Sequence, residues 1–165
     1  MDNQPRQTKR VEMKLNLQVV APLLDVIKAV AGSLKSHLAV TAPTAEDAGD
    51  EEMAALWRDS LLETQNAGVD ALLALFDGGF FKTGAITLDA GNGAQIVRAC
   101  AAVRLGVRGK FLKMFSDESL EQGIGDVDFK KYPDDIRRAM MCYMFLATIQ
   151  EVIIANLGRE ICNFP

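Results

Sequence analysis

The sequence is poor in the residues that build metal centres and redox sites. It has one histidine, His37, and three cysteines, Cys100, Cys142 and Cys162, which lie far apart and form no CxxC pair. A closed zinc site needs about four such ligands, so the sequence excludes one and predicts neither a metal nor a cofactor. Scattered cysteines in odd number are typical of reduced thiols, which indicates a cytoplasmic protein.

Motifs for phosphate, calcium and export are also missing. Gly84, Gly91 and Gly93 precede a helical stretch but match neither GxGxxG nor GK[ST], so we predict a plain connection there. Asp126 and Asp128 lack the glutamate and the spacing of a calcium loop. The first ten residues contain no apolar run of the kind found in signal peptides, and we therefore expect no export signal.

Long apolar runs and a strong charge of one sign are absent as well. The net charge is −4 and the isoelectric point is about 5.0, a balance that argues against general nucleic-acid binding. The longest apolar run, Ala139–Leu157, is interrupted by Gln150 and Glu151, and we predict a buried helix rather than a membrane span. A length of 165 residues suits one domain.

Alternating apolar and polar residues mark the beginning of the chain. Apolar side chains stand at every second position from Val11 to Val19, which predicts a strand over residues 10–20 with one buried face. A second short strand is predicted over residues 84–89. Because a lone strand leaves its backbone groups unpaired, we expect the two strands to pair. The polar residues 1–9 are predicted to be disordered.

The rest of the chain follows the helical period. Helices are predicted over residues 22–38, 51–76, 93–115 and 133–158, with glycines at 78, 79 and 158 as stop signals. An acidic loop is predicted at 41–52 and an irregular acidic lobe at 116–133. The fold class predicted is mainly α, a single domain over residues 10–165 with about four helices and a two-stranded β element.

Two of these helices carry apolar residues whose cover we can predict. The second helix has one apolar side, and we expect Trp57 on that side to belong to the core. The residues of this side are Met53, Leu56, Trp57, Leu61, Val69, Leu72, Leu73 and Phe76. The last helix is apolar almost all round between residues 139 and 149. We therefore place it at the centre of the bundle or against a second subunit.

The third predicted helix carries bases and no acid. Its bases are Arg98, Arg104, Arg108, Lys110 and Lys113. Helical projection places Arg104 and Arg108 beside apolar residues, where a guanidinium needs an acceptor. An internal ion pair with Asp59, Glu63 or Glu151 would supply one; an anion, a phosphate or a DNA backbone is the alternative.

Three further residues are candidates for binding. Glu151 lies in the most apolar helix, where it is a carboxylate of raised pKa, a partner of an arginine, or a residue at which the helix meets solvent. Phe80 and Phe81 follow a double glycine. One of them is expected at an interface, unless both belong to the core. No catalytic residue is predicted, and the chain is predicted not to be an enzyme.

The order of several short motifs resembles a bacterial family of unknown function, often actinobacterial, that is commonly encoded beside the adaptor of the Clp protease. The similar segments lie within residues 10–157 and are Val11–Leu17, Leu23–Leu38, Ala54–Leu61, Leu88–Asp89, Arg104–Gly106, Tyr143–Leu146 and Gln150–Glu151. The resemblance implies a cytosolic bacterial protein connected with regulation or proteolysis, with no established activity.

The function predicted is a non-catalytic protein-interaction or regulatory module. We expect a homo-oligomer, with a dimer favoured, and a protein partner rather than nucleic acid or a membrane. One alternative is a DNA-binding regulator that uses the basic third helix. The other is a small-ligand binder or enzyme with a site at Arg104 and Glu151.

Overall fold

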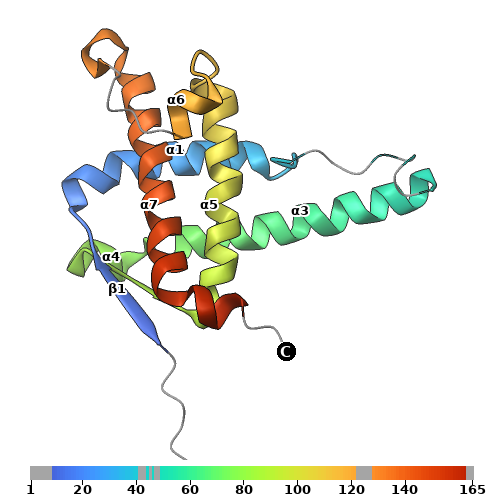
Figure 1. Cartoon of the computed structure of the whole chain (residues 1–165), viewed down its shortest axis with the longest axis horizontal. Helices are drawn as coiled ribbons and strands as arrows, with labels where there is room; N and C mark the ends of the chain where they lie inside the picture. The colour runs from blue at the N-terminus through green and yellow to red at the C-terminus, as the bar shows by residue number, and fades with distance from the viewer. Residues whose placement is uncertain (1–8, 41–43, 45, 47–48, 122–127, 163–165) are drawn as a thin grey trace, which may run out of the picture.

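A computed structural model of the chain describes residues 9–40, 44, 46, 49–121 and 128–162 (Figure 1). Residues 1–8 of the predicted disordered segment and half of the predicted acidic loop 41–52 lie outside these residues. The elements in chain order are β1 Arg10–Lys14, α1 Leu17–Leu34, α3 Glu51–Ala74, α4 Gly78–Thr83, β2 Ala85–Asp89, α5 Ala90–Phe111, α6 Asp117–Glu121, the 3-10 turn Phe129–Lys131 and α7 Asp134–Cys162. The predicted mainly α fold with a two-stranded β element is confirmed.

The two strands pair antiparallel, with Arg10 opposite Asp89 and Lys14 opposite Ala85. The first strand is shorter than predicted. Asn16 follows it as the helix cap, because its side chain accepts hydrogen bonds from the amides of Gln18 and Val19 and so starts α1 at Leu17.

The connection between α3 and β2 also differs from prediction. Gly78 and Gly79 do not end a helix but begin the short helix α4, because the Asp77 carboxylate accepts from the Gly79 and Phe80 amides. α4 ends at Gly84, whose φ of 69° is the left-handed conformation that glycine adopts without strain.

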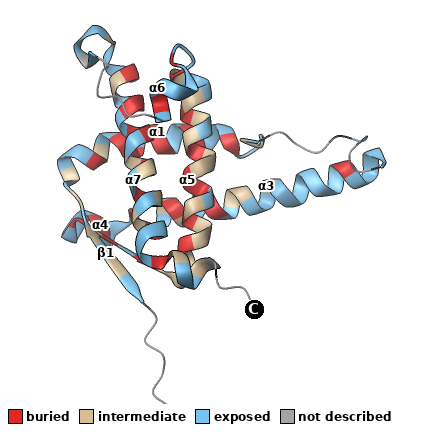
Figure 2. Cartoon of the chain, viewed as in Figure 1, coloured by how far each residue is buried: buried red, intermediate tan, exposed pale blue. Residues whose placement is uncertain are grey.

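The core is built around α5, which packs against α1, α3 and α7 (Figure 2). Asp89 and Asn92 form a reciprocal capping box, so α5 begins at Ala90 rather than at residue 93. Fully buried residues from three helices meet here, among them Ile27, Val103 and Leu146. The predicted central position of the last helix is therefore only partly confirmed, because α7 packs against α5 and α1 but leaves one face open.

α7 is longer than predicted and continues through Gly158 to Cys162. Its open face carries Met141, Met144 and Ile154, which are 46%, 44% and 60% exposed. Within the described residues, two helices, α1 and α7 over Asp134–Ile161, are long and apolar enough to cross a membrane by length and composition. Because core helices of soluble proteins pass the same test, this is weak evidence for a span.

The predicted irregular lobe contains regular structure within its described residues. It contains α6 and the 3-10 turn, and its residues 122–127, including Asp126 of the dismissed calcium pattern, lie outside the described part of the chain. Leu120 and Phe115 anchor its first half in the core.

Candidate protein-interaction surface

Arg104 is held inside the bundle by neutral partners. Its guanidinium donates to Gln150 Oε1 at 2.8 Å and lies 4.3 Å from the centre of the Tyr143 ring. Gln150 in turn donates through Nε2 to the Val97 carbonyl at 3.0 Å. Within the described residues, the buried Nε of Arg104 has no hydrogen-bond partner. The arginine therefore links α5 to α7 through an amide and an aromatic ring.

The acids predicted to pair with Arg104 do not do so. Glu151 is exposed, and its neighbour Gln150 is the residue that reaches the guanidinium. Asp59 and Glu63 lie exposed on α3. The structure therefore does not bring Arg104 and Glu151 together as one site, and the prediction of an acidic partner for Arg104 is wrong.

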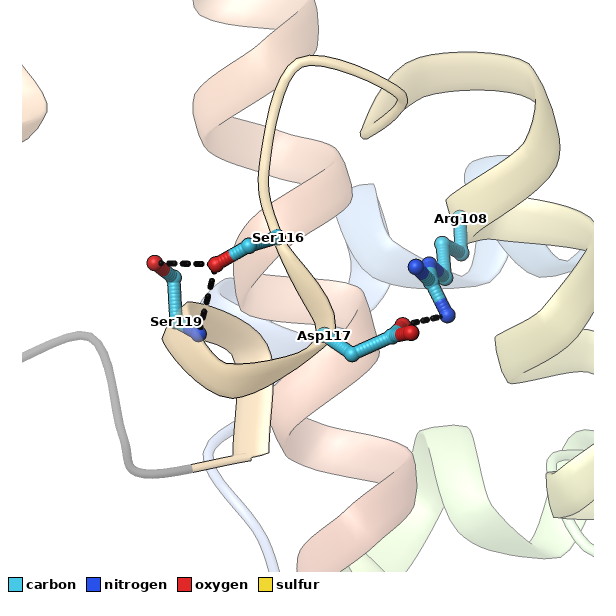
Figure 3. A network of polar contacts seen from close by, with 4 residues as sticks. All are labelled: Arg108, Ser116, Asp117 and Ser119. Atoms are coloured by element: carbon cyan, nitrogen blue, oxygen red, sulfur yellow. Dashed lines mark hydrogen bonds and ion pairs between the residues drawn. The ribbon is translucent and has the colours of Figure 1, made fainter.

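Arg108 forms an ion pair with a residue that the sequence did not single out. Its guanidinium contacts the Asp117 carboxylate at the start of α6, next to a small hydrogen-bond network between Ser116 and Ser119 (Figure 3). Both side chains of the pair are partly exposed, at 34% and 68%, so the pair adds little stability. Its role is to hold α6 against the end of α5.

Phe80 and Phe81 are divided between core and surface. Phe80 is 1% exposed and meets Phe76 edge to face, with ring centres 5.1 Å apart. Phe81 is 50% exposed and borders a shallow hollow with Pro22 and Arg138. One aromatic of the pair thus faces solvent, as the interface interpretation expected, while the other is a core residue.

The thiols of Cys100 and Cys142 are chemically unreactive because both are buried. Burial raises the pKa of Cys100 to about 12, against a smaller opposing effect of the Arg104 charge, and burial likewise raises the pKa of Cys142 to about 12. No cluster of three or more histidine, cysteine, aspartate or glutamate residues capable of holding a metal occurs in the described part of the chain.

The N-terminal half of α3 projects away from the bundle (Figure 1). We call residues 51–64 the arm; at about 1.5 Å per residue it is roughly 21 Å long. Four of its large apolar side chains, Met53, Leu56, Trp57 and Leu61, form a stripe and are 40%, 58%, 46% and 43% exposed. The prediction that Trp57 belongs to the core is therefore wrong, although the predicted apolar side of the helix is right.

A groove of about 570 Å³ lies at the root of the arm. Its floor is made of small residues from α3 and α5, including Ala67, Gly68 and Ala102, and its walls include Val40 and Leu105. At the floor, α3 and α5 approach each other closely because their side chains are small: a Cβ added at Gly68 would meet the Ala99 Cβ at 3.5 Å. Leu61 belongs to both the stripe and the groove lining, so the two surfaces are continuous.

Gln65 fixes one wall of the groove. It donates to the carbonyls of Leu34 and His37 at 3.0 and 2.9 Å and accepts from the Ala39 amide at 2.9 Å. Asn66 donates to the Lys35 carbonyl at 3.1 Å. These bonds satisfy carbonyls at the C-terminal end of α1 and hold the segment after α1 against α3, so the groove is formed before any ligand arrives.

Charge divides the arm from the groove. The arm carries four carboxylates, Glu51, Glu52, Asp59 and Glu63, against one arginine. α5, which provides one side of the groove, has four bases and no acid. Arg98 stands exposed at the groove, with no ion pair recorded to the described acids. The groove lining itself contains one base, Arg98, and one acid, Glu63, so the arm is acidic whereas the groove has no net charge.

Comparison with known proteins adds no assignment: no family model matches the chain, and neither curated proteins nor solved structures gave a match.

The arm, the groove and Gln65 are the features that sequence reasoning missed. One signal was available: α3 has 24 residues, more than the 18 residues of α1 can cover.

Proposed function

We propose that this chain is a non-catalytic protein-interaction module whose recognition element is the stripe on the arm. The observation that carries the proposal is a projecting helix with four large apolar side chains, each at least 40% exposed. Monomeric proteins seldom leave such side chains together on one unsupported helix face, and amphipathic helices commonly bind by placing that face in an apolar groove.

Several features favour binding over catalysis. Arg104, the best candidate for a catalytic or ligand-binding residue, already has Gln150 and Tyr143 as partners. The alternative of a DNA-binding regulator is disfavoured because α5 is covered by three other helices and so cannot enter a groove of DNA. Cys100 and Cys142 are buried and protonated at neutral pH.

The cellular setting is proposed on sequence grounds alone. Reduced thiols and an apolar stripe suit a protein that works in the cytoplasm. The resemblance to the family encoded beside the Clp adaptor adds the proposal that its partner belongs to regulated proteolysis.

The test compares capture from source lysate by three forms of the chain. Leu56→Glu places a charge in the stripe, and Ile154→Glu places the same charge on the open face of α7, where the side chain is 60% exposed. We expect wild type and Ile154→Glu to retain the same stoichiometric partner, including any second copy of the chain, and Leu56→Glu to lose it. Equal retention by all three forms would refute the arm as the recognition element.

A further inference from the structure

We propose that the occupant of the groove is the arm of a second copy of this chain, so that two copies exchange arms reciprocally. This inference rests on the proposed function and names its partner. The stripe and the groove lie next to each other on one helix, but an arm cannot fold back onto its own groove because α3 runs without a break from Glu51 to Ala74. The groove adjoining each stripe is therefore available to another molecule.

The arrangement of the surfaces favours a two-fold pair. On a helix of 3.6 residues per turn, Met53, Trp57, Leu61 and Gly68 lie on one side, which runs from the arm tip into the groove. Two arms placed antiparallel with these sides in contact put each tip over the groove of the other copy. A symmetric contact of this kind uses the same patch on both subunits and makes both exchanges at once.

Charge supports the same occupant. The tip of the arm carries Glu51 and Glu52, beside the capping residue Asp50, and the groove it would cover carries the exposed Arg98 together with Glu63. Antiparallel arms place each acidic tip near Arg98 of the other copy, whereas parallel arms would bring the two acidic tips together.

The area available is at the lower limit for a specific dimer. With roughly 150–250 Å² for a large side chain, the exposed parts of the stripe amount to about 350 Å² per copy. The groove lining exposes less area than the stripe and shares Leu61 with it, so two stripes and two grooves would bury roughly 1,000 Å², about the least that a specific interface needs. The small residues of the floor leave space for Trp57, the largest side chain of the stripe.

The experiment measures mass by sedimentation equilibrium at micromolar concentration for wild type, Leu56→Glu in the arm, Leu105→Glu in the groove and Ile154→Glu as the control. The two test positions and the control are 58%, 43% and 60% exposed, so all should fold, which circular dichroism checks. We expect dimers of wild type and control and at least tenfold weaker association of the arm and groove variants.

Mixing the two weakened variants tests reciprocity. Leu56→Glu keeps an intact groove and Leu105→Glu keeps an intact arm, so their mixture restores one of the two exchanges, and a heterodimer should form more tightly than either homodimer. No heterodimer, or a dimer that Leu105→Glu leaves intact, would overturn the arm–groove exchange. A monomeric wild type whose arm still captures another protein would overturn self-association and leave the proposed function standing. A dimer unaffected by both variants would overturn the exchange of arms, and equal capture of another protein by wild type and Leu56→Glu would overturn the proposed function as well.

Discussion

Two glycines on α5 are expected to respond in opposite ways to the same substitution. A Cβ added at Gly106 would lie 2.5 Å from Val30 Cγ1 on α1, whereas a Cβ at Gly109 would meet no atom within 4 Å. Val30 is fully buried and β-branched, so it has no free rotamer into which it can retreat. The substitution therefore tests directly how closely α1 and α5 approach.

The magnitude follows from two opposing effects. Replacing glycine by alanine inside a helix gains up to about 1 kcal/mol from helix propensity. At Gly106 this is outweighed by overpacking, which costs about 1–3 kcal/mol in a tight core. We expect Gly106→Ala to lose about 1–2 kcal/mol of unfolding free energy, and Gly109→Ala to gain roughly 0.5 kcal/mol because it lies in the last turn.

Urea unfolding followed by far-ultraviolet circular dichroism measures both variants. The Leu56→Glu background keeps unfolding unimolecular if the chain dimerises through its arms. Unchanged slopes with midpoints moved in opposite directions would support the packing of α1 on α5. Equal stability of the two variants would refute the close approach at Gly106.

Three other measurements follow from the structure. Arg104→Met should lower the free energy of unfolding by about 0.5–2 kcal/mol, because it removes a charged hydrogen bond and a ring contact but also removes the unsatisfied Nε. Capture by the arm should not change. Loss of capture with an intact fold would instead make Arg104 a binding residue. Trp57, the only tryptophan, should be quenched by acrylamide more strongly in Leu105→Glu than in wild type, and equal quenching would contradict its burial between copies. Cys100 and Cys142 should resist a thiol reagent at pH 8 until the protein unfolds. Because folding raises the pKa of each thiol from 9.0 to about 12, the free energy of unfolding should fall between about pH 9 and pH 12, by up to about 1.4 kcal/mol per pH unit for each thiol. A free energy of unfolding that does not change over this pH range would refute this.

The sequence predicted the elements of the fold better than their ends. Period-two and helical patterns located both strands and all four long helices, because apolar periodicity depends on local geometry. The boundaries were wrong where a side chain caps the backbone: Asn16 starts α1 early, Asp77 turns a double glycine into a helix start, and Asn92 extends α5. Such hydrogen bonds follow from short-range patterns that periodicity alone does not weigh.

The site was less predictable because its residues are defined by distant neighbours. Arg104 was correctly expected beside apolar residues, but whether Gln150 or Glu151 reaches it depends on the rotation of α7, and one residue on a helix changes direction by about 100°. Gln65 carried no signal at all, since its three partners belong to α1 and the segment after it.

The arm shows why an apolar stripe identifies a contact face but not what covers it. The same spacing that buries Ile149, Ile153 and Leu157 on α7 recurs at Met53, Trp57 and Leu61, yet only the first set is buried by its own chain. If the stripe of each copy were covered head to tail by the groove of the next copy, one stripe and one groove would stay free at the two ends. Copies would then add without limit. Antiparallel arms avoid this, because Leu61 belongs to both surfaces and one pairing of α3 with its symmetry mate fills both grooves. A mass that stops at twice that of the chain is therefore the outcome expected from this geometry, and a mass that keeps rising with concentration would require a different orientation of the arms.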